Sequence, residues 1–117
     1  MAELLLERLL RNLLSNARRH SPDGAVTVIG EELREGRSGV LLAVEDEGPG
    51  VPAEHREVIF EPFHRLDAAR NRDAGGVGLG LHLCRQIARA HGGNIHVEDR
   101  RDGASGARFV VTLPADA

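Results

Sequence analysis

The first twenty residues carry the hydrophobic pattern of an amphipathic helix. Between positions 4 and 20, apolar side chains recur every three or four residues, and polar or charged side chains fill the positions between them. The apolar stripe consists of Leu6, Leu9, Leu10, Leu13, Leu14 and Ala17, and Arg8, Arg11, Ser15 and Arg18 fall on the opposite side. Residues 21–24 (SPDG) then end the helix and turn the chain. We predict a helix over residues 4–20 whose leucine face packs on the core.

Shorter apolar runs predict two hairpins. Residues 26–33 and 40–45 are rich in apolar and β-branched side chains and are joined by a polar stretch with glycines, as in an antiparallel hairpin. Residues 94–99 and 107–113 form a second pair around a glycine-containing turn.

A second helix completes the pattern. Residues 79–91 are predicted to be helical and to end at Gly92, and a short helical segment begins at Pro52. The inward residues of the second helix would be Leu79, Leu83, Cys84, Ile87 and Ala88. The order of elements predicts one α+β domain over residues 1–117. It would be a two-layer α/β sandwich, with a mostly antiparallel mixed sheet covered on one face by about three helices.

Composition narrows the function classes. The 117 residues carry a net charge of -3 and include no basic run, so nucleic acid is not expected as a ligand. A single cysteine, Cys84, excludes an internal disulfide and favours a reducing compartment. No apolar run approaches the ~20 residues of a membrane span. All 15 cationic side chains are arginines, so a cationic contact to a phosphate has to come from arginine.

Glycines gather just before the second predicted helix, at Gly76, Gly78 and Gly80. Glycines let several backbone N–H groups approach one anion, and a helix N-terminus adds the positive end of its dipole. The pattern is neither a P-loop nor a dinucleotide fingerprint. Taken alone, it leaves a phosphate-binding loop and a flexible loop as alternatives. Residues 66–74 before it lack an apolar period and are predicted to form a lid, which Phe60 and Phe63 would fasten unless they are simply core residues.

Three polar residues line up along one edge of the leucine stripe: Asn12, Asn16 and Arg19. Asparagine is a poor helix former, so two of them one turn apart at a core boundary need an explanation. They either hydrogen-bond to neighbouring backbone or turn their amide oxygens toward a ligand or a hard cation such as Mg²⁺.

A carboxylate ends the second predicted strand. Asp46 is followed by Gly48 and Gly50, which would let a ligand approach the backbone. A carboxylate in such a place can accept a hydrogen bond from the amino group of a flat heterocycle. The alternative is an aspartate that only caps the loop. Two prolines and the absence of a βαβ succession argue against a Rossmann unit.

Four motifs together resemble one family. Residues 12–20 (NLLSNARRH), 46–50 (DEGPG), 60–65 (FEPFHR) and 76–81 (GVGLGL) resemble the N, G1, F and G2 boxes of the catalytic ATP-binding domain of bacterial two-component sensor histidine kinases. The motifs stand in the family's order, and the resemblance covers essentially the whole chain. It implies a Bergerat-type fold with ATP and Mg²⁺ as cofactors.

The resemblance also implies a role for each matched residue. Asp46 would accept a hydrogen bond from the adenine amino group, and Asn16 would hold Mg²⁺ with help from Asn12. Arg19 would lie near the phosphates, so that Asn12, Asn16 and Arg19 are the implied catalytic residues. His20 stands where the family often has an aromatic residue near the nucleoside. The implied nucleotide-binding residues are Asn12, Asn16, Arg19, His20, Asp46, Gly48, Gly50, Val51, Phe63, Arg65, Gly76, Val77, Gly78, Leu79, Gly80 and Leu81.

The family's phosphoacceptor is not found in the sequence, because none of the six histidines stands in the pattern that such kinases use. The resemblance therefore implies a fragment of a larger kinase, whose γ-phosphoryl group goes to a histidine on a separate dimerisation domain and then to a response regulator. The parent protein would be an inner-membrane sensor with this domain in the cytoplasm. Alone, the fragment should bind ATP without autophosphorylating.

Three other functions are weighed against this one. Related ATP hydrolases tend to carry a general-base glutamate where this chain has Asn12, whose amide cannot accept a proton. A free-standing serine kinase that inhibits a sigma factor would match the small size, although the F-box and extended lid fit a histidine kinase better. A module that has lost catalysis would not need Asn16, Asp46 and the glycine boxes.

Overall fold

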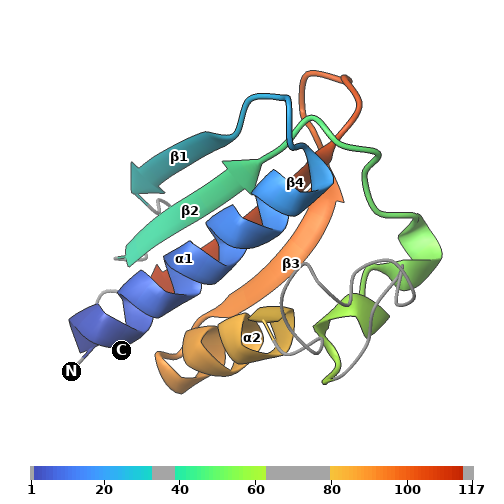
Figure 1. Cartoon of the computed structure of the whole chain (residues 1–117). Coiled ribbons are helices and arrows are strands. Elements are labelled where there is room, and N and C mark those ends of the chain that lie inside the picture. Colours follow the sequence, from blue (N-terminus) through green and yellow to red (C-terminus); the bar gives the residue numbers. More distant parts are fainter. Residues whose placement is uncertain (1, 33–38, 63–79, 115–117) are drawn as a thin grey trace.

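The computed structural model describes residues 2–32, 39–62 and 80–114, which form a sheet with helices against one face (Figure 1). The elements are α1 (Ala2–His20), β1 (Thr27–Glu32), β2 (Gly39–Glu45), the 3-10 turns η1 (Ala53–His55) and η2 (Val58–Phe60), α2 (Gly80–Ala90), β3 (Asn94–Asp99) and β4 (Ala107–Pro114). Each predicted helix and strand is found within a few residues of its predicted bounds.

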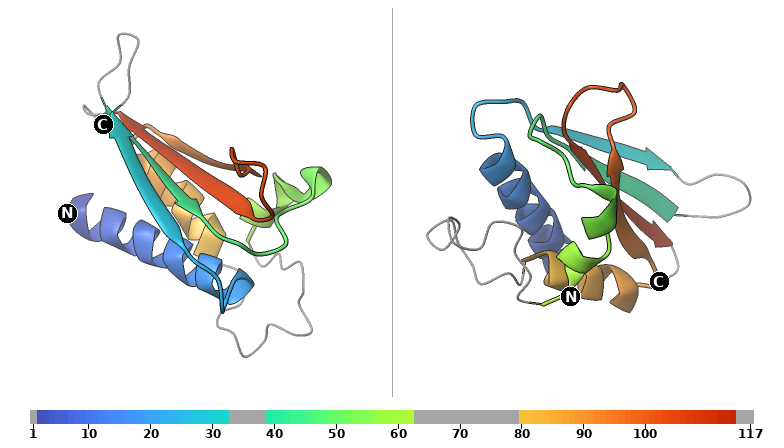
Figure 2. Two further views of the ribbon diagram at one scale, coloured as in Figure 1. Left: turned by 90° about the horizontal axis from the view of Figure 1, so that it is seen from above. Right: turned by 90° about the vertical axis from the view of Figure 1, so that its right-hand side faces the viewer.

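The sheet has the strand order β1-β2-β4-β3. Every pairing among the described strands is antiparallel, and Val44 on β2 pairs with Val28 on β1 and with Phe109 on β4. The views in Figures 1 and 2 place α1 and α2 side by side against one face of the sheet. The predicted α+β fold is thereby confirmed, and within the described ranges the sheet that we expected to be mixed contains no parallel pair.

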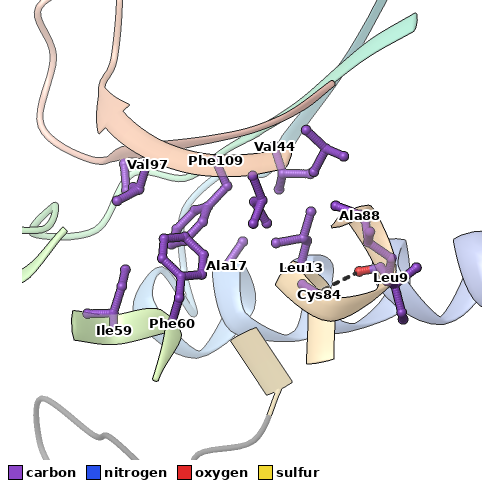
Figure 3. Packing of buried hydrophobic residues seen from close by; sticks show 14 of the residues in the cluster. Leu9, Leu13, Ala17, Val44, Ile59, Phe60, Cys84, Ala88, Val97 and Phe109 are labelled. Atoms are coloured by element: carbon purple, nitrogen blue, oxygen red, sulfur yellow. Dashed lines mark hydrogen bonds between the residues drawn. The ribbon is translucent and has the colours of Figure 1, made fainter. Parts of the chain in front are cut away.

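The core lies between this sheet face and the two helices. Leu9 and Leu13 of α1 meet Cys84 and Ala88 of α2 beneath Phe109 of β4, and all five are buried (Figure 3). These residues come from the apolar stripes that the sequence predicts, and burial of such side chains is the main stabilising contribution to folding.

The inward face of α2 differs from the prediction in one residue. Leu81 and Leu83 are both half-buried, and of the two it is Leu81 that packs against the buried core cluster. The helix begins at Gly80, and its most buried residues are Cys84, Ile87 and Ala88. It ends as expected: Gly92 has φ +82° and donates to the Arg89 carbonyl, and Gly93 donates to the Ala88 carbonyl at 2.8 Å.

Candidate functional site

The carboxylate of Asp46 is fixed by backbone donors at the end of β2. Its side chain is 1% exposed, and Oδ1 accepts hydrogen bonds from the N–H groups of Gly48 at 2.9 Å and Ala107 at 3.2 Å. Within the described ranges, both hydrogen bonds found to this carboxylate end on Oδ1. One oxygen of a buried carboxylate is thus held in place while the other keeps its capacity to accept a hydrogen bond.

Gly48 brings the loop after β2 against the end of α1. A Cβ at this position would collide with the His20 carbonyl oxygen, so only glycine allows this approach without a shift of the backbone. Gly50 has φ +82° and lies against the Gly106 carbonyl, where a Cβ would come within 3.0 Å. The two glycines of the predicted motif are therefore required by close backbone approach on both sides of the loop.

Two further hydrogen bonds hold this loop against the end of α1. The Glu47 N–H donates to Ser21 Oγ at 3.2 Å, and Glu47 Oε1 accepts from the Ala25 N–H at 3.0 Å. Val51, further along the loop, packs against the core, and its carbonyl accepts from Arg56 Nε at 3.2 Å. The structure therefore places the Asp46 loop next to the last turn of α1, although the two are about 26 residues apart in sequence.

The last turns of α1 carry the other predicted polar residues. Asn16 is 3% exposed, whereas Arg19 and His20 are exposed. The Nδ2 atoms of Asn12 and Asn16 are buried and have no hydrogen-bond partner in the described part of the chain. An unsatisfied buried amide costs about 1–3 kcal/mol. Within the described ranges, neither amide nitrogen donates to backbone, and the ligand-binding role of the two side chains stays a prediction.

Asn12 lies beside the thiol of Cys84 on α2. Burial raises the pKa of Cys84 to about 12. The thiol donates to the Leu9 carbonyl at 3.6 Å (Figure 3). The thiol therefore stays protonated near neutral pH, and only the thiolate is nucleophilic. Cys84 is thus a core residue and not a nucleophile, as its apolar helical face predicts.

Phe60 anchors the chain at one end of the segment where the lid is predicted. Its ring packs edge-on against Phe109 with the centroids 6.2 Å apart, and the Arg85 guanidinium lies 4.3 Å from its centroid. His82 Nδ1 is 3.3 Å from the Phe60 carbonyl oxygen, and Arg85 pairs with Glu57 at 3.3 Å. Phe60 is therefore a core residue that ties η2 to α2.

The glycine-box residues are only partly described. Gly80 is the first residue of α2, and a Cβ on it would enter open space. Leu81 packs against the core. The other predicted residues of the lid and of this box lie outside the described residues: Phe63, Arg65, Gly76, Val77, Gly78 and Leu79, together with residues 66–74. Their predicted roles stay predictions.

A family model matches the whole chain. Its description is "Histidine kinase-, DNA gyrase B-, and HSP90-like ATPase", and the match spans residues 1–117. The chain belongs to this ATPase family. This match confirms the ATPase family, and the relatives and solved structures below confirm the resemblance to sensor histidine kinases.

The curated relatives of this ATPase domain are sensor kinases. The chain is 46% identical to the sensor protein RstB of Escherichia coli over 94% of its own length and 24% of RstB. It is 45% identical to the alginate biosynthesis sensor protein KinB of Pseudomonas aeruginosa, over 95% of the chain and 17% of KinB. The chain thus spans a quarter or less of the length of these relatives.

Solved structures agree with this placement in the ATPase family. The mycobacterial sensor histidine kinase MprB matches with a TM-score of 0.79 and 34% identity, over 94% of this chain and 72% of that one. Full-length ShkA in complex with AMPPNP matches with a TM-score of 0.78 and 32% identity, over 97% of this chain and 22% of that one.

Three residues of the site were not found from the sequence: Arg100, Ser105 and Ala107. Arg100 Nη1 donates to the Asp46 carbonyl at 3.2 Å, and Ser105 Oγ donates to the Gly48 carbonyl at 2.7 Å. They lie more than 50 residues after the loop that they contact, so no local spacing links them to it. The only signal was the predicted hairpin turn, which the sequence could not place beside Asp46.

Two other observations bear on the ATPase domain. The described residues hold no group of three His, Cys, Asp or Glu side chains that could bind a metal by themselves. Among the helices of the described ranges, none has the length and hydropathy needed to span a membrane.

Proposed function

We propose that this chain binds ATP together with Mg²⁺ and donates the γ-phosphoryl group to a histidine on a separate dimerisation domain, in two-component signalling. The observation that carries the proposal is the buried Asp46, whose Oδ1 is held by two backbone N–H groups and whose Oδ2 is left to accept a further hydrogen bond. The family match and the sensor kinases among the relatives support the same conclusion.

The adenine end of the nucleotide would lie against the loop after β2. Oδ2 of Asp46 would accept the exocyclic amino group of adenine, and a hydrogen bond to a charged group contributes about 1.5–3 kcal/mol. Gly48, packed against the His20 carbonyl, keeps side-chain atoms away from this part of the loop. His20 would then lie near the nucleoside, as the family resemblance implies.

The phosphate end would lie toward Asn16, one turn before the end of α1. The Asn16 side chain fits Mg²⁺, because its amide carries the hard oxygen donor that this ion prefers and is buried without a hydrogen-bond partner for its nitrogen in the described ranges. The described residues supply no cluster of carboxylates, which suits an ion whose other ligands are phosphates and water. When bound, the ion neutralises phosphate charge during transfer. Arg19 would add positive charge.

Transfer to a protein group is favoured over hydrolysis. Asn12 stands one turn before Asn16, where a general base would activate water, and an amide cannot accept that proton. The acceptor would therefore be a histidine supplied by the dimerisation domain, and a response regulator would receive the phosphoryl group from there. Because ATP is the donor, the domain would work in the cytoplasm. As the family resemblance implies, it would be part of an inner-membrane sensor.

Calorimetric titration with ATP, with and without Mg²⁺, tests this proposal. We expect micromolar binding that Mg²⁺ strengthens, with negligible phosphate release in the same sample. Asp46→Asn should weaken ATP binding by about tenfold or more, because it exchanges a carboxylate acceptor for an amide that can present a donor. Asp99→Asn, an exposed aspartate on β3 that pairs with Arg56, is the matched control and should bind ATP normally. Rapid hydrolysis, or equal binding by Asp46→Asn, would overturn the assignment.

A further inference from the structure

The turn between β3 and β4 holds the loop that carries Asp46. Arg100 Nη1 donates to the Asp46 backbone carbonyl at 3.2 Å, and only 15% of the Arg100 side chain is exposed. Figure 1 shows this turn, in orange, beside the loop that leaves β2. The two segments are 54 residues apart, so this contact belongs to the tertiary structure alone.

Arg100 is itself held in one orientation. Asp102 accepts from Arg100 Nε at 3.1 Å and from Nη2 at 2.6 Å, a bidentate pair that fixes the plane of the guanidinium. Asp102 Oδ1 also accepts from the Ala104 N–H at 3.0 Å, and the Gly103 N–H donates to the Arg100 carbonyl at 3.2 Å. The third guanidinium nitrogen, Nη1, is the one directed to Asp46.

The same turn makes three more contacts with the Asp46 loop. Ser105 Oγ donates to the Gly48 carbonyl at 2.7 Å, and the Asp46 N–H donates to the Ala107 carbonyl at 3.0 Å. Gly106 has φ +138° and approaches the Asp46 carbonyl so closely that a Cβ would collide with it. The carbonyl that Arg100 holds is thus the one against which the turn is packed.

These contacts give Arg100 a role that goes beyond joining two loops. The Asp46 carboxylate is oriented through Oδ1 by the N–H groups of Gly48 and Ala107, which belong to the two segments that the turn holds together. A relative movement of these segments changes the direction of Oδ2. A hydrogen bond weakens steeply with misalignment, so even a small rotation matters for a bound base.

We infer that Arg100, locked by Asp102, is a positioning residue that aims the Asp46 carboxylate at the amino group of the base and so sets the selectivity for adenine nucleotides. The inference rests on the proposed function, because it assumes that Asp46 accepts the adenine amino group. When Arg100 is removed, the Ala107 N–H can still donate to Asp46 Oδ1 and the Asp46 N–H to the Ala107 carbonyl, so the loop keeps its fold. Selectivity falls because the loop can then shift against the turn.

The experiment compares the affinities for ATP and inosine triphosphate, which carries a carbonyl oxygen in place of the adenine amino group. The unmodified chain should prefer ATP by about tenfold or more, the effect of one hydrogen bond to a carboxylate. Arg100→Ala should reduce this ratio by about threefold or more, mainly through weaker ATP binding. Arg101→Ala is the matched control, because Arg101 is the next residue in the chain, its side chain is 66% exposed, and it pairs with Glu98 and not with Asp102. Its ratio should equal that of the unmodified chain.

A double-mutant cycle separates positioning from general loosening. In the Asp46→Ala background, Arg100→Ala should leave the ratio unchanged, since the side chain that it positions is gone. An equal fall in both backgrounds would overturn the inference, as would an unchanged ratio in Arg100→Ala. Asp102→Ala, at an exposed position that does not touch Asp46, should lower the ratio in the same direction and serves if Arg100→Ala folds poorly. If the unmodified chain binds no ATP, the proposed function fails; if it binds with selectivity that Arg100→Ala retains, only this inference fails.

Discussion

Glu45 on β2 and Arg108 on β4 are register partners, and an ion pair of 2.7 Å joins Glu45 Oε2 to Arg108 Nη1. Arg108 is only 2% exposed, and its Nε donates to Glu98 of β3 at 3.1 Å. Since Phe109 points into the core, Arg108 lies on the other face of the sheet. One buried guanidinium therefore links β2, β4 and β3 on the face away from the helices.

Arg108→Ala should lower the free energy of unfolding by about 2–3 kcal/mol, measured by urea denaturation. The substitution removes the packing of the arginine stem and leaves Glu45, which is mostly buried, without its partner. Glu98 is a third exposed and contributes less, because solvent screens it. Arg101→Ala, an exposed arginine that also pairs with Glu98, should change stability by no more than about 0.5 kcal/mol. Equal effects of the two substitutions would contradict a special role for Arg108.

The Glu98 carboxylate makes stability depend on pH in the acid range. Burial raises its pKa, but the hydrogen bond from His96 and the charges of His96, Arg108 and Arg101 outweigh burial, so the pKa lies below its ordinary value of 4.5. A carboxylate whose pKa is lower in the folded than in the unfolded state stabilises the fold at pH values above its unfolded-state pKa. This stabilisation is lost as the pH falls through the folded-state pKa.

We therefore expect the urea midpoint to fall as the pH is lowered below about 4.5, and Glu98→Gln to remove part of this dependence. The measurement is a set of urea titrations between pH 6 and pH 3 for both proteins. The variant should be less stable at pH 6, and its difference from the unmodified chain should shrink toward pH 3. Parallel curves over the whole range would exclude Glu98 as a contributor.

Gly48→Ala should weaken ATP binding and lower stability together. The added methyl group would collide with the His20 carbonyl oxygen, a backbone atom that cannot rotate away, so the loop and the end of α1 must separate. A loss of about 1–3 kcal/mol in unfolding free energy is typical of such overpacking. At Gly30, on edge strand β1, a Cβ would make an ordinary contact with Leu42 at 3.7 Å. Gly30→Ala is therefore the control and should leave ATP affinity unchanged.

The elements that follow from local pattern were predicted closely. The strand predicted over residues 94–99 is β3 (Asn94–Asp99), because apolar Ile95 and Val97 alternate with polar side chains that face away from the core. The end of α2 at Gly92 also follows from local chemistry, since glycine reaches the positive φ that this cap requires. The motif residues Asp46 and Gly48 were predicted because their spacing within one loop matches the family pattern.

The supports of the site could not be predicted in the same way. Arg100 and Ser105 donate hydrogen bonds to backbone carbonyl groups of the Asp46 loop. Every residue has a backbone carbonyl, so no residue type in the sequence identifies the acceptor. The pairing of β4 with β2 decides which turn lies beside Asp46, and this pairing joins the second strand of each predicted hairpin. Strand order between hairpins depends on packing of the whole domain.

The buried amide of Asn16 predicts a conflict between stability and function. Its Nδ2 has no partner within the described residues, so Asn16→Leu, of similar volume, should raise the free energy of unfolding of the ligand-free chain by about 1–2 kcal/mol. The same substitution removes an oxygen donor for Mg²⁺, so the gain in ATP affinity on adding Mg²⁺ should be lost, while binding without metal should change by no more than about twofold. Thermal unfolding checks the change in stability, and calorimetry with and without Mg²⁺ checks the change in ATP affinity.

Asn94→Leu is the control and should lower stability, because the Asn94 side chain is exposed and already accepts a hydrogen bond from the Ile95 N–H. If the amide serves only packing, Asn16→Leu should be less stable and should keep a normal dependence on Mg²⁺. If the variant is more stable and no longer responds to Mg²⁺, the unsatisfied amide lowers stability because ligand binding requires it.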